Sequence, residues 1–212
     1  MKVLVVVAHP DDEVLGVGGT ICKHIAEGDQ VEVVIVTEPD NEYTTEYKAD
    51  KIRAQAKVDK FLGIKHRHNL NLPTVSLNTI PFGKLNNKIG DYVKIVNPEI
   101  VYTHFKGDLN LDHRLVYEAC LVATRPPKHI KLVCFETISE TEWGDQTFKP
   151  NYYIDVSEFL WKKVEAFGFY KSEIKALPHP RNSNGINTLA FKRGHESGLN
   201  VAEAFRIVRW YD

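Results

Sequence analysis

The stretch MKVLVVVAHPDDE, residues 1–13, decides the fold class. Residues 2–8 form a continuous run rich in β-branched side chains, which is typical of a strand covered on both faces of a parallel sheet. Residues 9–13 then place one imidazole and three carboxylates directly after that strand. Like charges held so close repel one another unless a cation lies among them. The opening of the chain therefore predicts a parallel sheet with a charged cluster at its carboxyl edge.

The rest of the chain alternates helix-like and strand-like segments. We expect helices over residues 14–27, 48–62, 81–96, 112–123 and 156–171, and strands over residues 31–37, 66–71, 99–103, 131–135 and 152–155. This alternation predicts an α/β fold: a Rossmann-like, doubly wound, mostly parallel sheet with helices on both faces. We expect one domain over residues 1–212, whose tail at 172–212, made of loops and a short terminal helix, packs over the active-site end.

Composition narrows the functional class. The 27 basic and 28 acidic residues nearly cancel, so no net field attracts polyanions and nucleic acid is not an expected partner. The three cysteines are far apart in apolar segments, which favours buried thiols over a redox or zinc-thiolate site. No apolar stretch approaches the roughly 20 residues of a membrane span, and the first residues lack a signal-peptide pattern. We therefore expect a cytoplasmic protein.

A second polar cluster, THFKGDLNLDHR at residues 103–114, follows the fourth expected strand. Ligands bind at the carboxyl ends of the strands in such sheets, so this loop is expected to face residues 9–13. Two histidines and one carboxylate around an open fourth position are the ligand set of a hydrolytic zinc site. The metal acidifies a bound water and polarises an amide carbonyl, and a spare carboxylate takes the proton.

These motifs resemble those of the LmbE-like, or PIG-L-type, N-acetylglucosamine deacetylases. AHPDDE at residues 8–13, VLGVGGT at 14–20 and the distant Asp112-His113 pair carry the likeness. His179-Pro180-Arg181, Arg193-Gly194 and AEAF at 202–205 resemble the C-terminal end of a branch associated with bacterial sugar deacetylation. The resemblance implies metal-dependent hydrolysis of the N-acetyl amide of an amino sugar or sugar conjugate, which releases acetate and a free amine.

Position by position, the resemblance implies that His9, Asp12 and His113 bind the metal and that Asp11 is the general base. It implies zinc, with Fe²⁺ as an alternative because histidine and aspartate ligands suit several metals. Glu13 is interpreted as an acidic residue of the helix N-terminus or as a partner of a ligand histidine. Family members often form homo-oligomers, and the oligomeric state is left open.

One departure from the family concerns the oxyanion. Better-known members carry a second histidine three residues before the ligand histidine, where this chain has Asn110. An asparagine amide can donate a hydrogen bond to an oxyanion but has no positive charge, so His104 and His179 are the other candidates. Asp112 is expected to orient His113 or the oxyanion donor.

Substrate contacts are harder to assign. Arg53 and Arg181 are candidate substrate-binding residues, although a solvated helix face explains Arg53 equally well. The loops at residues 38–47, 71–81 and 136–150 are expected to select the substrate among free sugars, nucleotide sugars, glycolipids and thiol glycosides.

Three other functions compete. Gly16, Gly18 and Gly19 suggest a dinucleotide fingerprint, but the turn before them is acidic and Ile21 replaces the next glycine, so close helix–sheet packing is the better interpretation. A non-catalytic metal- or sugar-binding protein would have no need of the spare carboxylate of Asp11. A Ser-His-Asp hydrolase lacks its G-x-S-x-G turn.

Overall fold

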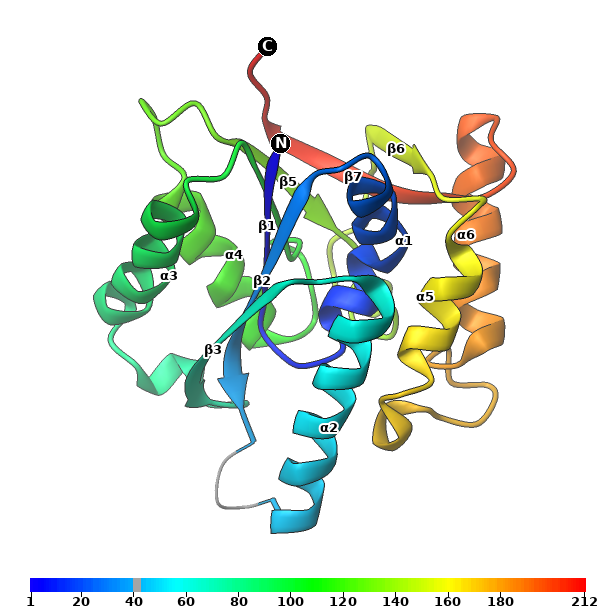
Figure 1. Ribbon diagram of the computed structural model, residues 1–212, viewed down its shortest axis with the longest axis horizontal. Coiled ribbons are helices and arrows are strands. Elements are labelled where there is room, and N and C mark those ends of the chain that lie inside the picture. The colour runs from blue at the N-terminus through cyan, green and yellow to red at the C-terminus, as the bar shows by residue number, and fades with distance from the viewer. Residues whose placement is uncertain (40–42) are drawn as a thin grey trace.

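The computed structural model describes residues 1–39 and 43–212 (Figure 1). Its strands are β1 (Lys2–Val7), β2 (Gln30–Glu38), β3 (His66–Pro73), β4 (Ile100–Thr103), β5 (Lys131–Phe135), β6 (Tyr152–Asp155) and β7 (Ala202–Arg209). Its helices are α1 (Asp12–Ala26), α2 (Thr45–Leu62), α3 (Phe82–Val96), α4 (Leu111–Ala123), α5 (Leu160–Phe167) and α6 (Ser183–Ser197). Short 3₁₀ turns lie at Leu77–Thr79 and Lys171–Glu173.

In the described part of the chain the strands form one sheet in the order β3-β2-β1-β4-β5-β7-β6. The first five strands of that order pair in parallel, and β7 pairs antiparallel with both β5 and β6. Helices α3 and α4 lie on one side of the sheet and α1, α2, α5 and α6 on the other (Figure 1). The expected doubly wound, mostly parallel α/β fold is confirmed.

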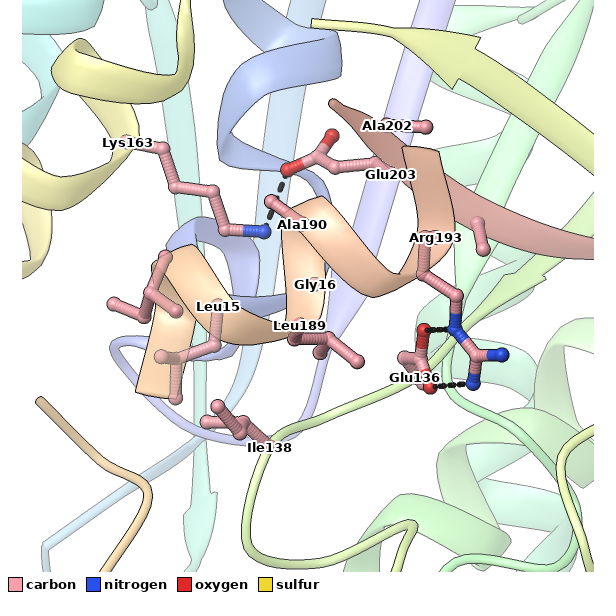
Figure 2. Close-up of a pocket in the computed structure, with 12 residues that line it drawn as sticks. Leu15, Gly16, Glu136, Ile138, Lys163, Leu189, Ala190, Arg193, Ala202 and Glu203 are labelled. Atoms are coloured by element: carbon pink, nitrogen blue, oxygen red, sulfur yellow. Dashed lines mark hydrogen bonds and ion pairs between the residues drawn. The ribbon is translucent and has the colours of Figure 1, made fainter. Parts of the chain in front are cut away.

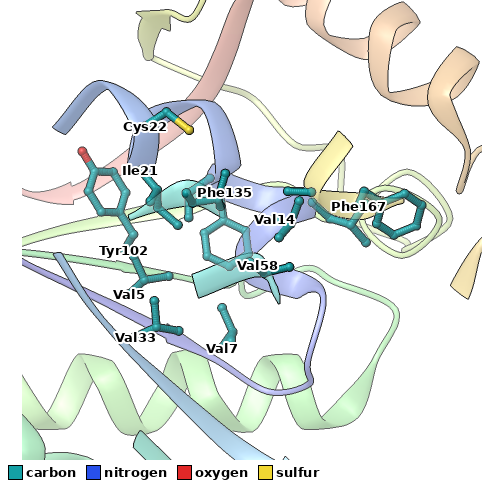
Figure 3. Packing of buried hydrophobic residues seen from close by; sticks show 14 of the residues in the cluster. Val5, Val7, Val14, Ile21, Cys22, Val33, Val58, Tyr102, Phe135 and Phe167 are labelled. Atoms are coloured by element: carbon teal, nitrogen blue, oxygen red, sulfur yellow. The ribbon is translucent and has the colours of Figure 1, made fainter. Parts of the chain in front are cut away.

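The central strand β1 is buried on both faces, as its β-branched run predicts. Val3, Val5 and Val7 pack into the core beneath α1, where Figure 3 shows Val5 and Val7 among side chains of α1, α2 and α5. Leu4 and Val6 point into the second core, under α3 and α4. This alternation follows from the two-residue period of a strand.

The glycines of α1 allow it to lie against the sheet and α5. A Cβ on Gly16 would lie 2.2 Å from the Phe135 ring, and one on Gly19 would lie 2.9 Å from Val156. The structure therefore supports the packing interpretation of these glycines. The helix is kinked at Val17, whose φ is −137°.

Strand β7 of the tail contacts α1 just after its kink. The buried Glu203 of β7 accepts hydrogen bonds from the amides of Gly19 (2.9 Å) and Thr20 (2.7 Å) and pairs with Lys163 at 2.6 Å. Figure 2 shows the adjoining cavity, where Arg193 and Glu136 form a second ion pair. At ≈ 20 Å³ this cavity has room for about one water molecule. We interpret it as a structural gap.

Two expected elements differ from the structure. The helix expected at 156–171 covers only Leu160–Phe167, because the Asp155 carboxylate accepts from the amide and hydroxyl of Ser157, while the Val156 amide pairs with the Val201 carbonyl. The tail does not end in a short helix: it contains the long helix α6 and then strand β7 inside the sheet. Strand β7 was difficult to recognise in the sequence because it contains the charged Glu203, whose burial depends on partners distant in sequence. The expected loop at 38–47 includes residues 40–42, which lie outside the described residues.

Candidate active site

Three predicted metal ligands converge at the carboxyl edge of β1 and β4. His9 and Asp12 flank the start of α1, and His113 lies in the first turn of α4. Nδ1 of His9 lies 3.1 Å from Nε2 of His113, and Oδ2 of Asp12 lies 3.4 Å and 3.3 Å from these two nitrogens. One ligand atom from each residue therefore lies within 4.8 Å of the others.

This donor set fits a divalent cation. Asp12 is fully buried, and its Oδ1 has no hydrogen-bond partner among the described residues. Burial opposes ionisation of Asp12, but the charges of His113 and His104 hold its pKa well below the usual range. Burial likewise opposes protonation of His113, yet Asp12 and Asp108 raise its pKa to about 10. The negative charges of Asp12 and Asp108, which would keep a proton on His113, also favour a metal cation at the same place.

A layer of side chains behind the three candidate ligands fixes their orientation. Oδ2 of Asp108 lies 3.1 Å from Nδ1 of His113, which leaves Nε2 of His113 facing Asp12. The ring of His104 stacks on that of His113 at 3.8 Å, and its Nε2 accepts a hydrogen bond from the amide of Ala8 at 2.9 Å. Such partners commonly select the tautomer of a ligand histidine. His104 is fully buried and does not line the cavity described below.

Asp11 combines a strained backbone with a buried carboxylate. Its φ of 118° lies in the left-handed region that glycine favours, and its side chain forms an ion pair of 3.2 Å with Arg181. Burial raises the pKa of Asp11 to about 7, although the charges of Lys51 and Arg181 oppose the shift. A carboxyl group with a pKa near neutrality is suited to accept and then return a proton.

Glu13 holds the strained turn in place. Its Oε2 accepts a hydrogen bond from the amide of Asp11 at 3.0 Å, and its Oε1 accepts one from the hydroxyl of Tyr170 at 2.7 Å and lies 3.0 Å from Nη1 of Arg67. The sequence suggested a helix N-terminal acid or a partner of a ligand histidine. Glu13 does lie in the first turn of α1, and its partners are the backbone of Asp11 and two residues that no motif marked, rather than a candidate ligand histidine.

A cavity of ≈ 180 Å³ opens beside His9 and Asp11. Its lining is mixed, with a polar part around His9 and Asp11 and an apolar part near the ends of β2 and β3. The lining residues are His9, Pro10, Asp11, Pro39, Tyr43, Tyr47, Lys51, Thr74, Val75, Asn110, Glu140, Glu173 and Arg181.

Lys51 and Glu173 were missed in the sequence analysis. Nζ of Lys51 lies 2.6 Å from Oε1 of Glu173, and Oε2 of Glu173 lies 3.4 Å from Nη1 of Arg181. Lys51 shares one helix face with the buried Ala54 and Val58, three and seven residues later. That spacing was a signal that Lys51 points inward. Glu173 had no such signal, because it lies in a short 3₁₀ turn of the tail.

The remaining predicted residues separate into two groups. Asn110 lines the cavity and caps α4, since its Oδ1 accepts a hydrogen bond from the amide of Asp112 at 2.9 Å. Arg181 lines the same cavity.

The second group does not line the cavity. His179 lies outside the lining, where its Nδ1 accepts a hydrogen bond from the amide of Arg181 and its ring packs edge-on against Trp143. Arg53 is not brought into this site: its side chain is 60% exposed and pairs with Asp50.

The family model described as GlcNAc-PI de-N-acetylase (PIG-L) matches residues 4–124, which include all three candidate ligands and Asp11. The chain belongs to the PIG-L family. The resemblance inferred from AHPDDE and the Asp112-His113 pair is thereby confirmed. Among curated relatives, this PIG-L family protein is 26% identical to a diacetylchitobiose deacetylase of Thermococcus kodakarensis, over 98% of this chain and 83% of the relative.

Solved structures share the fold of this PIG-L family protein. A conserved protein of Thermus thermophilus has a TM-score of 0.81 at 22% identity, covering 99% of this chain and 95% of that one. An N,N'-diacetylchitobiose deacetylase of Pyrococcus horikoshii has a TM-score of 0.79 at 22% identity, covering 98% and 83%. The 4-carboxy-2-hydroxymuconate hydratase of Pseudomonas putida has a TM-score of 0.81 at 19% identity, covering 100% and 97%. Since one of these neighbours is a hydratase, the fold alone does not define the reaction.

Proposed function

We propose that this chain is a metal-dependent N-deacetylase that hydrolyses the N-acetyl amide of an amino sugar or sugar conjugate, releasing acetate and a free amine. The observation that carries the proposal is the convergence of His9, Asp12 and His113 beside the separate carboxylate of Asp11, in a member of the PIG-L family. A purely structural metal site has no need of that additional carboxylate.

In this proposal His9, Asp12 and His113 hold the cation, which is zinc, with Fe²⁺ as the alternative. Such an ion polarises an amide carbonyl and acidifies a water molecule. Asp108 orients His113 through Nδ1, and Asp112 orients His9 through Nε2. His104 supports the ring of His113 by stacking and does not contact substrate.

Asp11 is the general base. Its carboxylate takes a proton from the attacking water and later returns it to the nitrogen as the carbon–nitrogen bond breaks, so that acetic acid and a neutral amine form. The acid then loses its proton to the amine or to solvent and leaves as acetate. Arg181 holds one oxygen of Asp11 at 3.2 Å and thereby fixes the direction of proton transfer. Asp11 is buried and Arg181 is partly buried, which limits the competition of water for that interaction.

The oxyanion of the tetrahedral intermediate needs a donor. We assign this role to the side-chain amide of Asn110, because Asn110 lines the cavity whereas His104 and His179 do not. His179 positions Arg181 through the hydrogen bond to its amide. Arg181, rather than Arg53, is then the arginine on the substrate side.

We also treat residues 1–212 as a single domain in which the tail at 172–212 supplies Glu173 and Arg181 to the cavity. None of the helices in the described ranges 1–39 and 43–212 has the combination of length and hydropathy needed to cross a membrane.

The test is acetate release. The purified chain, loaded with Zn²⁺ or Fe²⁺, is incubated with N-acetylglucosamine, N,N'-diacetylchitobiose, uridine diphosphate N-acetylglucosamine and an N-acetylated amino acid. We expect stoichiometric acetate and amine from at least one sugar and none from the amino acid. Absence of acetate with every sugar and both metals would refute the proposed reaction.

A further inference from the structure

The two sides of the cavity mouth differ in chemistry. Pro39, Tyr43 and Val75, which we call the apolar rim, follow β2 and β3, on one side of β1. Glu140 follows β5, on the other side of β1. Tyr43 is 36% and Val75 is 72% exposed, so solvent reaches apolar groups directly beside the candidate catalytic residues.

The orientation of the Tyr43 ring is fixed by stacking. Its ring stacks on that of Tyr47, with centroids 5.0 Å apart and planes inclined by 23°. Tyr47 is anchored in turn, because its hydroxyl donates to Glu173 at 3.0 Å and Nζ of Lys51 lies 5.5 Å from its ring centroid. The outer tyrosine is therefore supported from beneath by a ring that is tied to the site.

Val75 is also held in place, at a cost in backbone strain. Its φ of 58° is rare for a β-branched residue. The Asp112 carboxylate maintains this conformation by accepting hydrogen bonds from the amides of Val75 at 2.6 Å and Leu77 at 3.2 Å. Strain that the surroundings maintain is commonly found at ligand-contacting positions.

The charges at the mouth disfavour an anionic ligand. Among the described lining residues, the permanent cations are Lys51 and Arg181, and both are paired with carboxylates. Arg181 also lies close to carboxylate oxygens of Glu140 and Glu173. Among the described lining residues, a phosphate or carboxylate beside the apolar rim would therefore find no unpaired cation to bind.

We propose that the apolar rim is a subsite for the C–H face of a second, uncharged pyranose ring attached to the N-acetylated sugar. A pyranose has an apolar face and a polar edge, which matches an exposed aromatic ring opposite the carboxylate of Glu140, which can accept hydrogen bonds from sugar hydroxyl groups. This inference rests on the proposed function and narrows its substrate to a neutral disaccharide or a larger neutral glycoside. It assigns Tyr43 a role in selectivity.

The experiment compares N-acetylglucosamine, N,N'-diacetylchitobiose and N-acetylglucosamine 1-phosphate in the metal-loaded wild type, Tyr43→Ser and Tyr43→Phe. Phe82→Ser is the matched control, since Phe82 is 40% exposed but does not line the cavity. The Kd of the mono-deacetylated disaccharide, whose second ring keeps its N-acetyl group and is uncharged, is measured by calorimetry in the same proteins, and this measurement needs no turnover.

We expect the disaccharide to have the lowest KM, and Tyr43→Ser to raise that KM and the product Kd about three- to tenfold. Tyr43→Phe and Phe82→Ser should keep wild-type values, and KM for the monosaccharide should stay constant throughout. An unchanged KM and Kd in Tyr43→Ser would overturn the subsite, as would a preference for the phosphorylated sugar. If no sugar were deacetylated, the proposed reaction would fail, and the Kd values alone would still decide the subsite.

Discussion

Oδ2 of Asp112 lies 3.1 Å from Nε2 of His9, while Nδ1 of the same ring faces His113. The carboxylate thus favours the tautomer of His9 that carries its proton on Nε2 and leaves Nδ1 free for a metal. Asp112 also holds the backbone of Val75. One buried side chain therefore connects a candidate metal ligand to the rim of the cavity.

This relationship predicts the effect of Asp112→Asn. The amide cannot accept hydrogen bonds at both positions, so we expect metal affinity or kcat/KM to fall about 10- to 100-fold. Titration with a metal indicator and steady-state kinetics check the result. Asp91→Asn, at an exposed position of α3, is the matched control and should leave both quantities unchanged. Wild-type values in Asp112→Asn would show that His9 needs no such partner.

Glu13→Gln is expected to destabilise the fold. The substitution removes the buried negative charge that Arg67 faces and weakens the support of the strained turn at Asp11. Breaking a buried pair of this kind should lower the free energy of unfolding by about 3 kcal/mol, measured by urea denaturation. Tyr170→Phe removes one hydrogen bond to the same carboxylate and should lower it by about 1 kcal/mol. Equal losses in the two variants would argue against the charge pair.

Gly16→Ala tests why α1 is rich in glycine. Because its Cβ would lie 2.2 Å from the Phe135 ring, we expect overpacking to lower the free energy of unfolding by about 1–3 kcal/mol. Gly90→Ala, in the interior of α3 with open space around its Cα, should raise the free energy of unfolding by up to about 1 kcal/mol.

A separate measurement tests the dinucleotide interpretation of these glycines. If NAD raised the melting temperature of the wild type and divalent metal did not, that interpretation would be favoured over the metal site.

Metal loading should stabilise the protein. A cation that binds only the native state at about 1,000 times its Kd adds about 4 kcal/mol to the free energy of unfolding. We expect zinc to raise the melting temperature of the wild type and chelation to reverse the rise. His113→Ala should lose this response, and His195→Ala should retain it, since His195 is exposed and distant in sequence from the cluster. A response that survives His113→Ala would place the metal elsewhere.

The sequence predicted the features that depend on local patterns. The Val-rich run of β1 indicated a strand buried on both faces, and the acidic turn after it indicated the cluster that the structure brings together with His113. Both signals lie within short stretches, because strand burial and charge crowding are read directly from neighbouring residues.

Features that depend on contacts distant in sequence were not predicted. Strand β7 contains Glu203, whose burial is explained only by Lys163 and by the amides of α1. Lys51 and Glu173 pair although α2 and the tail are far apart in the sequence, so no motif could mark the pair. Arg53 was considered from the family resemblance, but the buried face of α2 carries Lys51 together with Ala54 and Val58, and the side chain of Arg53 is exposed.

The most direct test of the account measures bound metal and acetate release side by side in the wild type, Asp11→Asn and Asp12→Asn. We expect Asp11→Asn to bind metal at the wild-type stoichiometry while losing activity by about 10²- to 10⁴-fold, because only the base is removed. Asp12→Asn should lose both metal and activity. Full turnover by Asp11→Asn, or full metal content in Asp12→Asn, would contradict the assignment of these two neighbouring carboxylates.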